Sequence, residues 1–317
     1  MTAYHLAKIR AKLSRMLTED ELRAMGEVSR QELLERLRET SYGPYLGGET
    51  GDVEGLRRGF WEDVATLFLS LRGRDRALLD AVLAHWRVEN LKLIIRSKIR
   101  GIPPEEVEPL LHELPWERVD YKSLLSAPGI EALAKSLPWG DYARRIEAVH
   151  QQVGDRGETF PYEAGLDSLY LERLIHHLAV AGPDVTPILR NRIAKELFLW
   201  CFRLRGYGFS FPEMVSVLPD FHPLISQEEL RRIVEDAEGW RAVSRFLGQG
   251  PAEELSRMEG LDLGVLGDLF DRDLVLKVKR AFATAPFGMG IVVGYVYLKE
   301  TELRRLIRLL EEKGVRA

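Results

Sequence analysis

The sequence has almost no cysteine and no long hydrophobic run. Cys201 is the single cysteine among 317 residues, which excludes an internal disulfide framework and a zinc site built from several cysteines. The longest uncharged, largely apolar run, Met289 to Leu298, covers 10 residues, whereas a helix needs roughly 20 to span a bilayer. The first residues, Met1 to Lys8, contain no apolar core of the kind that secretory signals have. We therefore expect a cytoplasmic protein that would meet a membrane only from outside it.

The chain also lacks a strong charge of one sign. Its 45 Lys and Arg residues nearly balance 49 Asp and Glu residues, for a formal net charge of −4. Such a chain has no overall field that attracts nucleic acids or anionic lipids, so any partner of that kind would need a local patch. A composition that is 45% hydrophobic and 30% charged is typical of a folded, water-soluble protein and excludes a disordered chain.

Motifs for catalysis or cofactor binding are missing as well. No segment matches the phosphate-binding loop G-x-x-x-x-G-K-[ST]. None of the seven histidines pairs with another at the i, i+4 spacing of a zinc-binding helix, and the adjacent His176 and His177 point about 100° apart on a helix. Cys201 stands among apolar residues, where burial keeps a thiol protonated and unreactive. We expect no catalytic site, no metal and no cofactor.

Helical periodicity dominates the chain. Residues 74–100 place apolar side chains at helical spacing, from Leu78 through Trp86 to Ile99, and residues 166–181 repeat the pattern. No alternating segment of strand length competes with these stripes. Pro and Gly cluster between the periodic segments and mark short connections. The sequence therefore predicts an all-α fold.

Several features recur along the chain. Ser29 and Ser226, 197 residues apart, each precede a Glu by three positions and an apolar run, as in a helix capping box. Aromatic residues next to glycine follow at Tyr42, Trp139 and Trp240, and long basic helices end at Gly101, Gly206 and Gly314. The basic helix ends repeat at a shift of 105, and residues 90–96 align with 302–308 at a shift of 212. We predict three helical units, 1–108, 109–214 and 215–317; the alternative is one irregular helical domain.

Two segments give the chain a specific resemblance. Residues 85–98, HWRVENLKLIIRSK, and residues 286–306, with PFGMG followed by GYVYLKETELRRL, resemble the first and third internal motifs of the C subunit of archaeal and bacterial A/V-type ATPases. That protein corresponds to the d subunit of the eukaryotic vacuolar enzyme. Residues 166–170 resemble the helix opening of its second unit. Lys195 and Arg305 depart from the family pattern, since Asn is expected near the first and is frequent at the second.

The resemblance implies a fold and a task. In this family three helical bundles are arranged around a pseudo-threefold axis as a funnel. The wide end rests on the membrane-embedded proteolipid ring, and the funnel receives central-stalk subunits D and F. The chain would then be a non-catalytic socket, one copy per complex, peripheral on the cytoplasmic face, that couples ATP hydrolysis or synthesis to the translocation of hydrogen or other ions. The membrane would be contacted only through the ring, and nucleic acid not at all.

Polar residues on the repeated helices are the candidate partner-binding residues. They lie either along the polar lining of the central opening or on a solvated helix face, and the sequence leaves both interpretations open. The candidates are Arg87, Asn90, Lys92 and Arg96 near the first repeated helix end, with Lys299, Arg304 and Arg308 near the third. Two other functions stay possible: a helical adaptor for another soluble partner, and an enzyme with a site around Glu163, Asp167 and His176.

Overall fold

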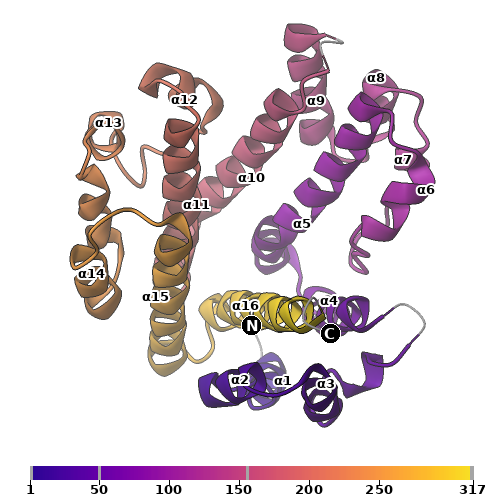
Figure 1. Ribbon diagram of the computed structural model, residues 1–317, viewed down its shortest axis with the longest axis vertical. Helices are drawn as coiled ribbons and strands as arrows, with labels where there is room; N and C mark the ends of the chain where they lie inside the picture. Colours follow the sequence, from indigo (N-terminus) through magenta and orange to yellow (C-terminus); the bar gives the residue numbers. More distant parts are fainter. Residues whose placement is uncertain (1–2, 49–50, 155–156, 315–317) are drawn as a thin grey trace. The chain divides into compact units, whose positions relative to one another are not determined.

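The computed structural model describes residues 3–48, 51–154 and 157–314 (Figure 1). Met1 and Thr2, at the sequence start considered above, lie outside these ranges. Over the described residues every regular element is a helix, which confirms the all-α prediction. No helix within them is both long and apolar enough to cross a bilayer. The chain divides into two compact units: residues 3–76 with 275–314 form unit 1, and residues 77–274 form unit 2.

Unit 1 brings the two ends of the chain together. Helix α16 packs against α1, α2, α3 and α4, so the last helix completes the core that the first four begin (Figure 1). Side chains such as Phe60, Trp61 and Tyr295 fill that core. The elements are α1 (Ala3–Leu13), α2 (Glu19–Gly26), α3 (Arg30–Arg38), η1 (Gly43–Tyr45), α4 (Asp52–Phe68) and α16 (Met289–Gly314).

Gly294 sets the approach between α16 and the end of α15 that belongs to unit 1. A Cβ at Gly294 would lie 2.6 Å from Cγ1 of Val278, closer than side chains normally approach. The absence of that carbon therefore lets the two helices pack closely. The helix α15 (Leu263–Thr284) passes from unit 2 into unit 1, and α5 (Gly73–Arg100) passes from unit 1 into unit 2.

Unit 2 consists mainly of long antiparallel helices with short helices attached. Helix α10 packs against α9 and α11, while α11 also contacts α12, α13 and η3 (Figure 1). Its remaining elements are α6 (Pro104–Val107), η2 (Glu108–Leu110), α7 (Tyr121–Leu125), α8 (Ile130–Ser136), α9 (Gly140–Val153), α10 (Phe160–Val180), α11 (Thr186–Gly206), α12 (Phe211–Val217), α13 (Gln227–Glu235), η3 (Gly239–Phe246) and α14 (Gln249–Ser256).

The helix ends follow local chemistry that the sequence shows. The predicted basic helices end at Arg100, Gly206 and Gly314, as expected. The hydroxyls of Ser29 and Ser226 accept hydrogen bonds from the amides three residues on, which confirms both as N-caps. The complete reciprocal capping box, however, forms at two other helix starts, Thr18 with Glu21 and Ser210 with Glu213.

Candidate partner-binding residues and buried ion pairs

Arg87 lies inside unit 2, although the sequence places it on a charged helix. Its side chain is 3% exposed; Nε donates to Glu117 at 2.7 Å and Nη2 to Asp80 at 2.9 Å. The guanidinium also stacks 4.5 Å from the ring centroid of Trp139. Burial raises the pKa of Glu117, and the charge of Arg87 offsets part of that rise. The guanidinium therefore joins α5 to the segment before α7 and to the start of α9.

Asn90, one turn further along α5, is fully buried and bonded through its amide. Its Nδ2 donates to the backbone oxygen of His112 at 2.9 Å, and its Oδ1 accepts from the backbone nitrogen of the same residue at 2.7 Å. A buried amide that uses both its donor and its acceptor on one backbone residue fixes that segment in register. Asn90 thus holds the chain after η2 against α5.

Lys92 and Arg96 join α5 to α10. The ammonium of Lys92 lies 2.6 Å from Asp167 and 3.0 Å from Glu89, and the Arg96 guanidinium donates two hydrogen bonds of 2.7 Å to the carboxylate of Glu163. Such a bidentate pair fixes orientation as well as charge. The hydrogen bonds from Arg96 lower the pKa of Glu163. Burial raises the pKa of Asp167 to about 6, and Lys92 offsets only part of that rise.

Lys299 occupies a comparable position in unit 1. Its ammonium bonds the carboxylate of Glu302 and lies 4.1 Å from the ring centroid of Tyr42. Glu302 also accepts hydrogen bonds from the hydroxyl of Tyr42 at 2.9 Å and from the backbone amide of Leu17 at 2.7 Å. Three segments of unit 1 therefore meet at one buried carboxylate, and every polar contact among them involves a charge, which strengthens it.

Arg304 and Arg308 face outward on the same helix. Both side chains are exposed, and Arg304 bonds the buried carboxylate of Glu300, one turn earlier. The candidates therefore divide by environment: Arg87, Asn90, Lys92 and Lys299 are buried with internal partners, Arg96 is half-buried, and Arg304 and Arg308 are exposed. A role of these seven residues in binding partner subunits stays a prediction.

Comparison with known proteins covers almost the whole chain. The sequence pattern of the ATP synthase (C/AC39) subunit family matches residues 6–316. The chain belongs to this family. It is 28% identical to the V-type ATP synthase C subunit of Thermus thermophilus, over 98% of this chain and 94% of that relative. It is 26% identical to the A-type ATP synthase C subunit of Methanothermobacter thermautotrophicus, over 96% and 82%. The A-type C subunit of Methanocaldococcus jannaschii is 23% identical, over 98% and 82%.

The C/AC39 membership confirms the resemblance that the two motifs indicated. Those motifs contain many of the buried contacts: Arg87, Asn90 and Lys92 in the first, and Tyr295, Lys299 and Glu302 in the third. The hydroxyl of Tyr295 bonds Asp63, which also bonds Lys12, so α1, α4 and α16 share a second polar contact. The motif residues therefore serve internal packing in this member of the family.

Sequence reasoning missed the contact between the buried cations and the aromatic corners. Lys299 stacks on Tyr42, and Arg87 stacks on Trp139. Both cations and both aromatic residues belong to features that recur in the sequence, and Lys299 follows Arg87 at the same shift of 212 that aligns the two helices. That shared shift was the available signal. The shift predicts that Arg87 and Lys299 occupy equivalent positions, but it does not predict that their side chains are buried.

The second long basic helix, α11, makes its own buried contacts. Nδ2 of Asn191 donates to Asp273 at 2.7 Å and to the backbone oxygen of Phe270 at 3.2 Å. The ammonium of Lys195 lies 2.5 Å from Asp271. Lys195 thus stands where Asn is expected, and its ammonium pairs with a carboxylate on α15. Helix α11 therefore keeps its polar contacts with α15 despite this departure from the family pattern.

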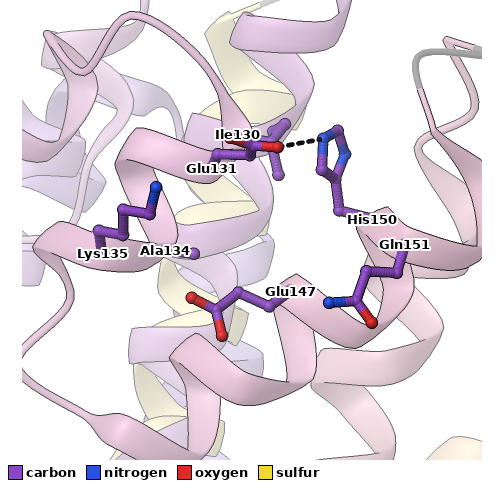
Figure 2. A pocket seen from close by; sticks show the side chains of 7 residues that line it. All are labelled: Ile130, Glu131, Ala134, Lys135, Glu147, His150 and Gln151. Atoms are coloured by element: carbon purple, nitrogen blue, oxygen red, sulfur yellow. Dashed lines mark ion pairs between the residues drawn. The ribbon is translucent and has the colours of Figure 1, made fainter.

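Two pockets in unit 2 are lined by both polar and apolar side chains. One of about 200 Å³ lies between α8 and α9, where Nε2 of His150 is 3.9 Å from Glu131 (Figure 2). Nδ1 of His150 is 2.7 Å from the Tyr162 hydroxyl. The other, of about 480 Å³, is lined in part by Trp240 and Arg205. Within the described part of the chain no cluster of His, Cys, Asp and Glu could hold a metal ion.

The alternative enzyme site does not assemble on α10. Glu163 and Asp167 lie on the same face of that helix, but each is bonded to a cation of α5. His176 is exposed and stands nine residues, or about 13 Å, beyond Asp167 along the helix. The three groups therefore do not converge on one reacting atom.

Proposed function

We propose that this chain is the socket of a rotary ATP synthase, placed between the proteolipid ring and central-stalk subunits D and F. The observation that carries the proposal is the match to the C/AC39 family over residues 6–316. In this role the chain is non-catalytic, present in one copy per complex and peripheral on the cytoplasmic face. It transmits rotation, so that ATP hydrolysis or synthesis is coupled to ion translocation.

The buried ion pairs support a load-bearing role. Torque passes through a body only if the helices resist sliding, and close-packed interiors have low compressibility. Here α5 is bonded to α10 through Lys92 and Arg96. Helix α16 is bonded to α4 through Tyr295, and to the segments that follow α1 and α3 through Glu302. Charge-assisted hydrogen bonds have a fixed geometry, so they add a resistance to sliding that apolar contacts alone lack. The long helices are therefore tied to the shorter helices around them.

We further propose three repeated units, 1–108, 109–214 and 215–317, around a pseudo-threefold axis that forms a funnel. The recurring cation and aromatic contact of Lys299 with Tyr42 and of Arg87 with Trp139 supports a repeat. Each predicted unit contains a long helix with one or two basic residues in its last turn, which ends at Arg100, Gly206 or Gly314. A funnel of this kind offers separate surfaces to a ring below and a stalk above.

Affinity purification tests the role directly. A tag on the full chain, expressed in its own cells, should recover the proteolipid ring and subunits D and F from washed membranes. Because a permanent assembly buries a large surface, above about 2,000 Å² in total, recovery should survive dilution. Recovery of the chain without either component, under conditions that preserve the ATP synthase, would show that it is an adaptor for some other partner.

The predicted partner-binding residues need variants that keep the fold. Charge reversal of Arg96 alone would place two carboxylates together, because Glu163 is its partner. The exchange of Arg96→Glu with Glu163→Arg retains an internal pair while it changes the charge on each helix. Combined with Arg308→Glu at an exposed position of α16, it should weaken recovery of D and F if these residues face the stalk. Unchanged recovery would remove them from that interface.

A further inference from the structure

One end of unit 1 concentrates positive charge. Segments 66–76 and 277–289 contain six cationic side chains and a single carboxylate, a formal charge of +5 in a chain whose total is −4. The carboxylate is Asp75. The cations are Arg72, Arg74, Arg76, Lys277, Lys279 and Arg280. This is the local patch that a near-neutral chain needs in order to attract an anionic partner.

Leu69 and Phe287 lie at the same end of unit 1 because α4 and α16 run antiparallel, and Lys279 and Arg280 follow Val278, which packs against Gly294 beside Tyr295. Asp63 on α4 bonds Tyr295 on α16, whereas the earlier Gly59 packs against Tyr42, whose hydroxyl bonds the later Glu302. From the contact of Asp63 with Tyr295, α4 runs five residues onward to Phe68 and α16 six residues back to Met289, about 8 and 9 Å in the same direction, and Leu69 and Phe287 follow just beyond these helix ends.

Two large apolar side chains project from this end. Leu69, just after α4, is 52% exposed, and Phe287, between α15 and α16, is 60% exposed. Phe287 follows Pro286 in a tight turn. The side chains of Arg72, Arg74, Lys279 and Arg280 are exposed as well, and Arg72 donates to the backbone oxygen of Leu69, which holds its charge beside the apolar side chain.

We infer that this surface binds the anionic phospholipid headgroups of a membrane. We call it the basic end, made of Leu69, Arg72, Arg74, Lys279, Arg280 and Phe287. Arg and Lys side chains attract a negatively charged lipid surface, and single Leu and Phe side chains between them can enter the boundary between headgroups and acyl chains. The basic end thus adds a direct lipid contact to a subunit that the sequence placed on the membrane only through the ring.

A lipid surface fits these residues better than an acidic protein does. A stable protein interface buries roughly 800 Å² per partner around a close-packed apolar centre. The basic end offers instead two exposed apolar side chains on turns together with four exposed cationic side chains. A fluid headgroup layer adapts to such a surface without matching its shape. Lipid binding at the basic end also does not depend on the socket role, because it requires neither ring nor stalk.

Vesicle sedimentation with the purified full chain tests the inference. The chain should pellet with vesicles of phosphatidylcholine that contain phosphatidylglycerol and stay in solution with pure phosphatidylcholine. Binding should fall as salt is raised, because screening shortens to about 3 Å at 1 M. Each cation near an anionic surface accounts for about a fivefold change in affinity, so Arg72→Glu with Lys279→Glu and Arg280→Glu should weaken binding at least about 100-fold.

A matched control distinguishes binding through the basic end from nonspecific adsorption to vesicles. Val180, the last residue of α10, is 74% exposed with no Lys or Arg in residues 178–187, so Val180→Ser should leave sedimentation unchanged. Leu69→Ser with Phe287→Ser should reduce it about tenfold, with an unchanged unfolding midpoint to show that the fold is intact. Equal binding to both vesicle types, or no effect of the charge reversals, overturns the inference. So does binding to purified ring in detergent with none to anionic vesicles, which would identify an acidic protein surface instead.

Discussion

The Lys299 ammonium lies 4.1 Å from the ring centroid of Tyr42 while both side chains bond the same carboxylate, Glu302. Lys299 and Glu302 are 4% and 2% exposed, so water does not compensate if either is lost. Lys299→Met should therefore lower the free energy of unfolding by about 3–5 kcal/mol, the usual consequence of leaving one buried charge alone. Urea denaturation measures it. Arg308→Met on the exposed face of α16 is the control and should stay within about 0.5 kcal/mol; a loss under about 1 kcal/mol for Lys299→Met would contradict the contact.

Arg87 should not be replaceable by lysine. The planar guanidinium bonds Glu117 and Asp80 at once and stacks on Trp139, and an ammonium cannot do all three. We expect Arg87→Lys to destabilise the chain by about 1–3 kcal/mol, measured by denaturant unfolding. Arg100→Lys, exposed at the end of the same helix, is the matched control. Equal midpoints for the two variants would mean that the charge alone matters.

Gly294 should tolerate no added carbon unless Val278 is shortened. Gly294→Ala places a Cβ 2.6 Å from Cγ1 of Val278 and should cost about 1–3 kcal/mol through overpacking. Val278→Ala removes the two methyl groups that clash. The double variant should therefore be less destabilised than the sum of the single variants. If the two destabilisations were strictly additive in a double-mutant cycle, the clash with Val278 would not be the cause of the loss at Gly294→Ala.

Asp167 should make the chain respond to pH in the direction opposite to most carboxylates. Burial raises its pKa from 3.8 to about 6, so the folded state holds a proton that the unfolded state has lost between those two values. The chain should gain stability from this group as the pH falls from 7 through 6 towards 4. The Asp167→Asn variant has no group that titrates at this position. Subtracting its melting temperature from that of the unmodified chain at each pH cancels the contribution of the other carboxylates. A difference that does not change over this range would refute the shift.

Cys201 should react with thiol reagents only after unfolding. The side chain is fully buried, and burial raises the pKa of its thiol to about 12, so almost no thiolate exists near neutral pH. Labelling of the native chain by a disulfide reagent should follow the unfolding rate rather than the reagent concentration. Fast labelling, in proportion to the reagent, would show that the site opens locally.

Local sequence pattern predicted the helices because their causes are local. Apolar spacing, Ser29 and Ser226 as N-caps, and the Gly or basic helix ends act within one or two turns, and the structure contains each of them. The inward direction of Arg87 and Lys299 could not be predicted in this way. A cation between apolar residues looks the same whether it meets water or a carboxylate, and the Tyr42 that covers Lys299 lies 257 residues away.

The sequence by itself determined the helical class, the helix ends, the unreactive thiol and the C/AC39 family, since each depends on residue order or on near neighbours. Only the tertiary structure decided which polar residues are buried. It turned Arg87, Asn90, Lys92 and Lys299 inward to buried polar partners and left Arg304, Arg308 and the cations of the basic end outside. The physical reason is that a charge can be buried only where a counter-charge and hydrogen-bond partners are enclosed with it, and the segments that enclose them come together only once the chain has folded.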